Sequence, residues 1–131
     1  LKKYSDTTSV IFLEEILHGD KLKTARRLFT KKIITSLPDV IITSNDLIAQ
    51  GIISAAHENG INIPNDMQIT GFDDSLSSAY FIPSITTVSQ NIDELAKRCF
   101  SMLMDLINKK NAVSSIIEQN IIARNSAKVN I

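Results

Sequence analysis

The sequence has no excess of charge of either sign. Fourteen Lys and Arg residues balance fourteen Asp and Glu residues, so the net charge is zero and the isoelectric point is near 6.9. Domains that bind nucleic acid usually carry a basic excess that is concentrated on one face. We therefore expect no direct binding of DNA by this chain.

Residues suited to covalent or metal chemistry are scarce. The single cysteine, Cys99, cannot form an internal disulfide, and its place in an apolar helical pattern is typical of a small buried hydrophobic residue. Neither His18 nor His57 has a partner at the spacing of metal ligands. We therefore assign no catalytic residue, no metal and no cofactor, and we expect no enzyme activity.

Glycine-rich motifs and long apolar runs are also missing. The glycines at positions 19, 51, 60 and 71 form neither a phosphate loop nor a dinucleotide fingerprint. No uninterrupted apolar run approaches the roughly 18 residues of a membrane helix, and residues 1–15 lack the layout of a secretory signal. Because the start LKKYSDTT has no initiator Met, we expect the natural N-terminus to lie upstream.

The composition that remains is that of a folded domain. Of the 131 residues, 44% are hydrophobic and 21% are charged, which differs from the charge-rich composition of disordered chains. A chain of this length can form one domain or a piece of one, and two ordinary domains are excluded.

Strand and helix patterns alternate in the first part of the chain. Residues 9–16 form a β-branched and aromatic run, and residues 21–36 have helical spacing with a basic face that we expect to be solvated. The short apolar run at 40–44 lacks alternation, which is typical of a parallel strand buried on both faces. A helical pattern over 47–56 and another apolar run at 67–72 follow. This order predicts an α/β fold with a parallel sheet.

The second part of the chain contains one long helix and a final strand. Residues 75–83 are rich in serine and predict a turn-like stretch. Residues 91–108 predict a helix capped by Asn91, and its apolar residues are spread so widely that we expect burial on more than one side. The run at 115–123 predicts the last strand.

Polar residues follow two of the expected strands. Asn45 and Asp46 come after one of them, and Asp73 and Asp74 come after the next. In open parallel sheets, ligands bind at the carboxyl ends of the strands. We expect one of Asp73 and Asp74 to face this crevice and the other to contact backbone or solvent. An amide and a carboxylate together suit a sugar or nucleoside, although such residues are also common helix caps and turn formers.

Three segments in order carry a family resemblance. They are PDVIITSNDLIAQGIISAAHENGINIPNDMQITGFDD, then FIPSITTVSQNIDELAKRCFSML with a Pro, a Thr-Thr pair and a Gln before a helix, and IIEQNIIARNSA with an Arg and a Ser. Over residues 38–125, the chain resembles the effector-binding core of the lactose/galactose repressor (LacI/GalR) family.

The resemblance implies a three-layer α/β architecture with a parallel sheet, of the periplasmic-binding-protein-like type I, present here as one lobe plus a crossover helix. Residues 1–88 would form the C-terminal lobe of the effector-binding domain, with its first strand and helix missing. Residues 89–112 would form the crossover helix, which belongs to the N-terminal lobe. Residues 113–131 would form the returning strand and the C-terminal tail.

The resemblance also implies which residues contact the effector. The family's ligand-contacting Asn and Asp fall on Asn45 and Asp73, and the Gln before the crossover helix falls on Gln90. Asp46 would then cap the helix that follows it.

The family's dimer contacts fall on the first turns of two helices, near residues 20–25 and at Gln50 to Ser54, and on the loop 77–82, which contains Tyr80 and Phe81. Exposed aromatic rings in a turn-like segment are typical of an interface on physical grounds as well. The alternative is that both rings anchor the loop against the chain's own core.

The function implied by this resemblance is ligand sensing and dimerisation in a transcriptional repressor. The partners would be a small effector (a sugar, sugar phosphate or nucleobase-like molecule), a second copy of the chain, and operator DNA only through an absent N-terminal helix-turn-helix domain. The parent protein would be cytoplasmic, with no membrane contact. The alternative is a periplasmic sugar-binding protein of a transport system, which shares the core fold.

Two further classes fit the residues less well. A phosphoacceptor receiver domain would use the Asp pair with Thr86 or Thr87, but here the pair follows a later strand rather than the first. A glycosidase needs two carboxylates that flank a scissile bond, and adjacent residues at one strand end diverge.

Overall fold

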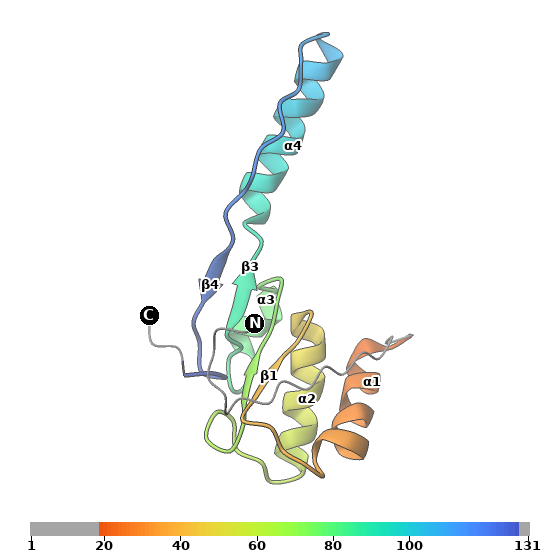
Figure 1. Ribbon diagram of the computed structural model, residues 1–131, viewed down its shortest axis with the longest axis vertical. Coiled ribbons are helices and arrows are strands. Elements are labelled where there is room, and N and C mark those ends of the chain that lie inside the picture. Colours follow the sequence, from red (N-terminus) through yellow and green to blue (C-terminus); the bar gives the residue numbers. More distant parts are fainter. Residues whose placement is uncertain (1–18, 129–131) are drawn as a thin grey trace, which may run out of the picture.

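The computed structural model describes residues 19–128, and Figure 1 shows how they are arranged. The strand expected at 9–16 and His18 lie outside the described residues. The helical elements are α1 (Lys21–Leu28), the π-helix η1 (Phe29–Ile33), α2 (Asp46–Glu58), α3 (Leu76–Tyr80) and α4 (Ile92–Ile107). The strands are β1 (Val40–Ile42), β2 (Gln68–Thr70), β3 (Thr87–Ser89) and β4 (Asn120–Ile122).

The strands form a parallel pair and an antiparallel pair. β1 and β2 are parallel, with Ile41 opposite Ile69. A single parallel bridge between Thr70 and Thr86 connects β2 to the segment that leads into β3. β3 and β4 are antiparallel, so the chain returns from α4 alongside the strand from which it left. The α/β class and the parallel pairing expected from the sequence are confirmed. The expectation that the first of these strands is buried on both faces is wrong, because Val40 and Ile42 of β1 are exposed.

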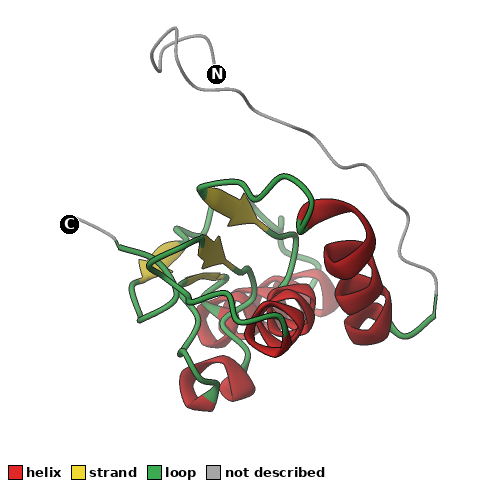
Figure 2. Ribbon diagram, turned by 90° about the horizontal axis from the view of Figure 1, so that it is seen from below, coloured by secondary structure: helices red, strands yellow, loops and turns green. Residues whose placement is uncertain are grey.

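The hydrophobic core lies between the parallel strands and the helices. In Figure 1, α2 lies between the strands and α1, and in Figure 2 the helices lie to the right of and below the strands. Gly51 allows α1 and α2 to pack closely, because a Cβ at this position would lie 2.6 Å from the carbonyl oxygen of Leu22. The buried hydrophobic residues are Ala25, Phe29, Ile33, Ala49, Ile52, Ile53, Ala55, Ala56, Met67, Ile69 and Ile85.

The basic face of α1 is only partly solvated. Lys23 and Arg27 of α1 are exposed, as expected, and so is Lys31 in η1. Arg26, however, donates from Nη2 to both carboxylate oxygens of Glu58, at 2.6 and 2.7 Å. This pair connects α1 to the last residue of α2 and supports the packing of the two helices.

Helix α4 is exposed along its length, so the expectation of burial on more than one side is wrong. None of its residues is buried, and Cys99, expected to be a buried hydrophobic residue, is exposed. Figure 1 shows the reason, since α4 projects away from the core and only the returning segment between α4 and β4 runs alongside it. The amphipathic pattern was read correctly as a helix, but no described segment covers its apolar side.

Other boundaries differ from expectation in detail. The stretch at 75–83, expected to be turn-like, contains the short helix α3. Asn91 stands at the start of α4, but its side chain makes no capping hydrogen bond and its backbone is left-handed, with φ of 51°. The last strand is shorter than the expected run at 115–123.

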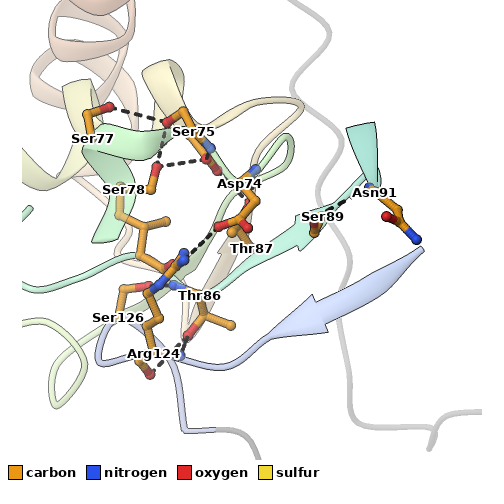
Figure 3. A network of polar contacts seen from close by, with 12 residues as sticks. Asp74, Ser75, Ser77, Ser78, Thr86, Thr87, Ser89, Asn91, Arg124 and Ser126 are labelled. Atoms are coloured by element: carbon orange, nitrogen blue, oxygen red, sulfur yellow. Dashed lines mark hydrogen bonds and ion pairs between the residues drawn. The ribbon is translucent and has the colours of Figure 1, made fainter. Parts of the chain in front are cut away.

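The C-terminal segment is fixed to the core by Ser126, which is fully buried. Its hydroxyl donates to the carbonyl of Ile69 at 2.6 Å and accepts from the backbone N–H of Thr86 at 2.9 Å. Figure 3 shows Ser126 beside Thr86 and Arg124. This segment therefore holds the end of β2 and the start of β3 in place.

Candidate functional site

The site is built where the loop after β2 meets the start of α2. Asn45 caps α2, with its side chain accepting from the N–H of Ile48 at 2.9 Å. Asp46, which the resemblance assigned as the cap, is instead the first residue of the helix. The assignment is wrong because the Asp46 side chain is directed away from its own helix toward Ser75, Ser78 and Thr87.

The loop after β2 places two aspartates in an uncommon backbone conformation. Asp73 and Asp74 have φ of 105° and 53°, which L residues rarely adopt and which costs about 1 to 3 kcal/mol each. Neighbouring contacts hold this conformation. The N–H of Asp73 donates to Val88 O at 2.9 Å, and the N–H of Asp74 lies 3.4 Å from Thr87 Oγ1. Strain of this kind often accompanies a ligand site.

The two aspartates have different partners. Asp73 is exposed, and its Oδ1 accepts a hydrogen bond from Nε2 of Gln90. Asp74 forms an ion pair with Nη2 of Arg124 at 2.6 Å. Figure 3 shows the two side chains directed toward one another. The expectation that the second aspartate contacts backbone or solvent is wrong, because Arg124 reaches it from the end of the returning segment.

The residues assigned to effector contact lie together. Asn45 and Asp73 line one open hollow of about 280 Å³, with Lys21, Gln50, Ser75 and Ser77 among its other lining residues. Gln90 reaches this group through its hydrogen bond to Asp73. In the described part of the chain, no group of three or more His, Cys, Asp or Glu residues could hold a metal ion.

The residues assigned to dimer contact range from buried to exposed. Gln50 is buried and donates from Nε2 to Ser77 Oγ at 2.7 Å, and Ser54 is half-buried. Tyr80 is 79% exposed. Phe81 is half-buried and packs against the hydrophobic core, so the expected exposure of both rings is correct for Tyr80 and wrong for Phe81.

Four contributors to the site were not identified from the sequence. Arg124 holds Asp74, and the donors to Asp46 are Ser75, Ser78 and Thr87. Serine and threonine in turns and strands carry no local signal of such a role. The Arg and Ser near the end of the chain belong to a segment of the family resemblance. Because their partners are far away in the sequence, the resemblance did not indicate which residues they contact.

Comparison with known proteins shows which family this chain is similar to. The sequence profile of the periplasmic binding protein-like domain family matches residues 7–127. The HTH-type transcriptional repressor PurR of Pasteurella multocida is 34% identical over 95 residues, which cover 71% of this chain and 28% of that protein. The HTH-type transcriptional regulator RegA of Clostridium acetobutylicum is 36% identical over 92 residues, which cover 69% of this chain and 28% of that protein.

The solved structure of a repressor protein is also similar to this chain. The periplasmic binding ribose operon repressor protein from Lactobacillus acidophilus superposes with a TM-score of 0.78 at 31% identity, covering 90% of this chain and 44% of that one. In open α/β sheets, ligands bind at the carboxyl ends of the strands, which is where Asn45 and Asp73 lie in this chain.

The chain belongs to the periplasmic binding protein-like domain family, in the branch formed by the effector-binding domains of LacI/GalR-type transcriptional regulators. Because the two curated relatives are regulators, they favour the regulator interpretation over that of a transport binding protein. The chain spans 28% of the length of each of them. No helix among residues 19–128 is long and apolar enough to cross a membrane.

Proposed function

We propose that this chain supplies one wall of the effector cleft in a LacI/GalR-type repressor, with Asn45, Asp73 and Gln90 as its contact residues. The observation that carries the proposal is that Asn45 and Asp73 line the same hollow. The Oδ1 of Asn45 is used as the helix cap, which leaves its NH₂ group to donate. The Oδ1 of Asp73 accepts from Gln90, which leaves Oδ2 to accept.

This pairing of a donor with an acceptor defines the ligand chemistry. A polyhydroxylated or heterocyclic ligand presents donors and acceptors side by side, as a sugar, a sugar phosphate or a nucleobase does. We infer that the site binds a ligand of this class without transforming it. The relatives named above are transcriptional regulators, which supports binding rather than catalysis.

The effector would control DNA binding at a distance. In this proposal, a helix-turn-helix domain elsewhere in a cytoplasmic parent protein contacts the operator, and the effector binds one arrangement of the lobes better than the other. The descriptions of the PurR and RegA relatives as HTH-type regulators support this arrangement.

The parts of the chain would have separate roles. Residues 1–88 would belong to the C-terminal lobe, residues 89–112 would pack on the N-terminal lobe, and residues 113–131 would return to the first. The exposed apolar side of α4 supports the second of these roles. Gln50, Ser54, Tyr80 and Phe81 would border the contact with a second copy of the protein, and the high exposure of Tyr80 supports this placement.

The experiment is a calorimetric titration of the full-length parent protein with D-ribose, glucose 6-phosphate and hypoxanthine. We expect one of these probes to bind, and Asp73→Asn to weaken its binding about tenfold or more, because a hydrogen bond to a charged group contributes about 1.5 to 3 kcal/mol. Asp39→Asn is the matched control, since Asp39 is exposed and does not line the hollow. Equal affinities for the Asp73 variant and the unmodified protein would contradict the proposal.

A further inference from the structure

The buried carboxylate of Asp46 is the feature that the proposed contacts do not use. Asp46 is only 1% exposed, although it borders the hollow at the first residue of α2. Oδ1 accepts from Thr87 Oγ1 at 2.6 Å. Oδ2 accepts from the N–H of Ser75 and from Ser78 Oγ, both at 2.7 Å. The donors come from the loop after β2, from α3 and from β3, so one side chain joins three elements.

Asp46 also holds the loop from its other end. Its backbone N–H donates to the carbonyl of Phe72 at 2.8 Å. Phe72 directly precedes the strained pair Asp73 and Asp74, and Ser75 directly follows this pair. The two positive-φ residues are therefore clamped on both sides by a single residue.

The residues around the Asp46 carboxylate pack closely against it. A Cβ at Gly71 would overlap Oδ1 of Asp46, so the adjacent strand end must carry a glycine for the carboxylate to occupy its place. Ser78 and Thr87, which donate to it, are themselves 0% and 1% exposed. Water is thus kept from the hydrogen bonds, and their geometry is fixed by the surrounding elements.

We propose that Asp46 is a positioning residue, which sets the placement of Asp73 relative to Asn45 and Gln90. Asn45 is the sequence neighbour of Asp46, and Asp73 lies within the loop that Asp46 clamps. Gln90 directly follows β3, the strand whose first residue, Thr87, donates to Asp46. This inference rests on the proposed function, because it takes Asn45, Asp73 and Gln90 as the contact residues and explains what keeps the three in one arrangement. Loss of the clamp would release the loop into other conformations and lower the affinity for the effector without removing any group that touches it.

The variant Asp46→Asn tests the proposal because it keeps the size of the side chain. Its one remaining carbonyl oxygen can still accept from Ser75 or from Thr87, but it cannot serve both sides of the carboxylate. Asp66→Asn is the matched control, because Asp66 also accepts from a backbone N–H, that of Asn62, but lies in another loop. Both variants are made in the full-length protein.

The first measurement needs no ligand. Hydrogen exchange followed by mass spectrometry should show faster exchange in peptides spanning residues 72–78 of the Asp46→Asn protein, by about tenfold or more. Peptides spanning residues 52–56 in the core of α2 should be unchanged, as should residues 72–78 in the control variant. Unchanged exchange at 72–78, or a rise that extends to 52–56, would overturn the proposal.

The second measurement separates positioning from general destabilisation. Whichever of D-ribose, glucose 6-phosphate and hypoxanthine binds the unmodified protein is titrated into Asp46→Asn, Asp73→Asn and the double variant. If Asp46 acts through Asp73, the Asp46 substitution weakens binding about tenfold alone and has little further effect in the double variant. Losses that multiply would overturn the positioning role. Binding by none of the three probes would count against the proposed function, while the exchange experiment would still decide the role of Asp46.

Discussion

Arg124 forms an ion pair of 2.6 Å with Asp74, a residue 50 positions earlier in the chain. The same guanidinium donates from Nη1 to the carbonyl of Ile85 at 2.9 Å. The end of the returning segment thus fixes the loop that carries Asp73. Both side chains are mostly buried, at 18% and 25% exposure, so solvent screens the pair only in part.

Replacement of this arginine should destabilise the protein. We expect Arg124→Met to lower the free energy of unfolding by about 1.5 to 3 kcal/mol, because it leaves the Asp74 carboxylate without its charged donor. Urea unfolding followed by circular dichroism measures the loss. Arg27→Met, at an exposed position of α1, is the control and should change stability by less than about 0.5 kcal/mol. Equal losses of unfolding free energy in the two variants would show that the ion pair does not contribute to stability.

Gly71 should be intolerant of a side chain because of Asp46. Gly71→Ala would force its Cβ against Oδ1 of Asp46, and overpacking of this kind costs about 1 to 3 kcal/mol. The cost should fall sharply when Gly71→Ala is combined with Asp46→Ala, which removes the opposing carboxylate. Gly60→Ala is the control, because that position has open space around it. Its cost, which comes from its φ of 74°, should not depend on Asp46. A cost for Gly71→Ala that persists unchanged in the double variant would refute the steric explanation.

The apolar side of α4 should drive self-association of this chain. Ile92, Leu95, Leu103 and Leu106 are between 39% and 59% exposed. Covering one large apolar side chain is worth about 1.5 to 3 kcal/mol. Sedimentation velocity should therefore show a dimer or larger species, and Leu103→Glu should shift it toward the monomer. Lys97→Glu, on the opposite side of the helix at 100° per residue, should leave the distribution unchanged. A monomeric unmodified chain, or equal effects of the two variants, would argue against association through this side.

This chain alone should not bind an operator specifically. Its net charge is zero, and neither its sequence nor the described part of its structure offers a basic recognition helix. A gel-shift titration with duplex DNA should show at most weak binding that disappears at about 200 mM salt. Complexes that persist at that salt concentration would mean that a DNA-binding surface had been missed.

The sequence predicted local features well because their signals are local. Helix α2 begins after Asn45 and ends before Gly60, close to the expected limits, since a cap and a positive-φ glycine act within a few residues of their own position. The parallel pairing of β1 with β2 also followed, because alternation of strands and helices leaves few other topologies.

Contacts between distant residues were beyond the reach of sequence patterns. The position of Asp46 before a helical run indicated a cap, yet its hydrogen-bond donors are 29 to 41 residues away. The stripe of α4 indicated that something must cover the helix, but a periodic pattern does not say which segment does so or whether it belongs to the same lobe. The burial of Cys99 was wrong for that reason.

Ligand binding at Asp73 should control operator affinity, and fluorescence anisotropy of the full-length protein measures this coupling. The operator is selected from random duplex DNA by repeated binding to that protein, and its affinity is measured with and without the probe that binds. The probe should change operator affinity by about fivefold to 150-fold, the usual range of allosteric coupling. The change should be lost in Asp73→Asn and kept in Asp39→Asn. An operator affinity that the probe leaves unchanged, or a response that survives Asp73→Asn in full, would contradict control of operator binding by this site.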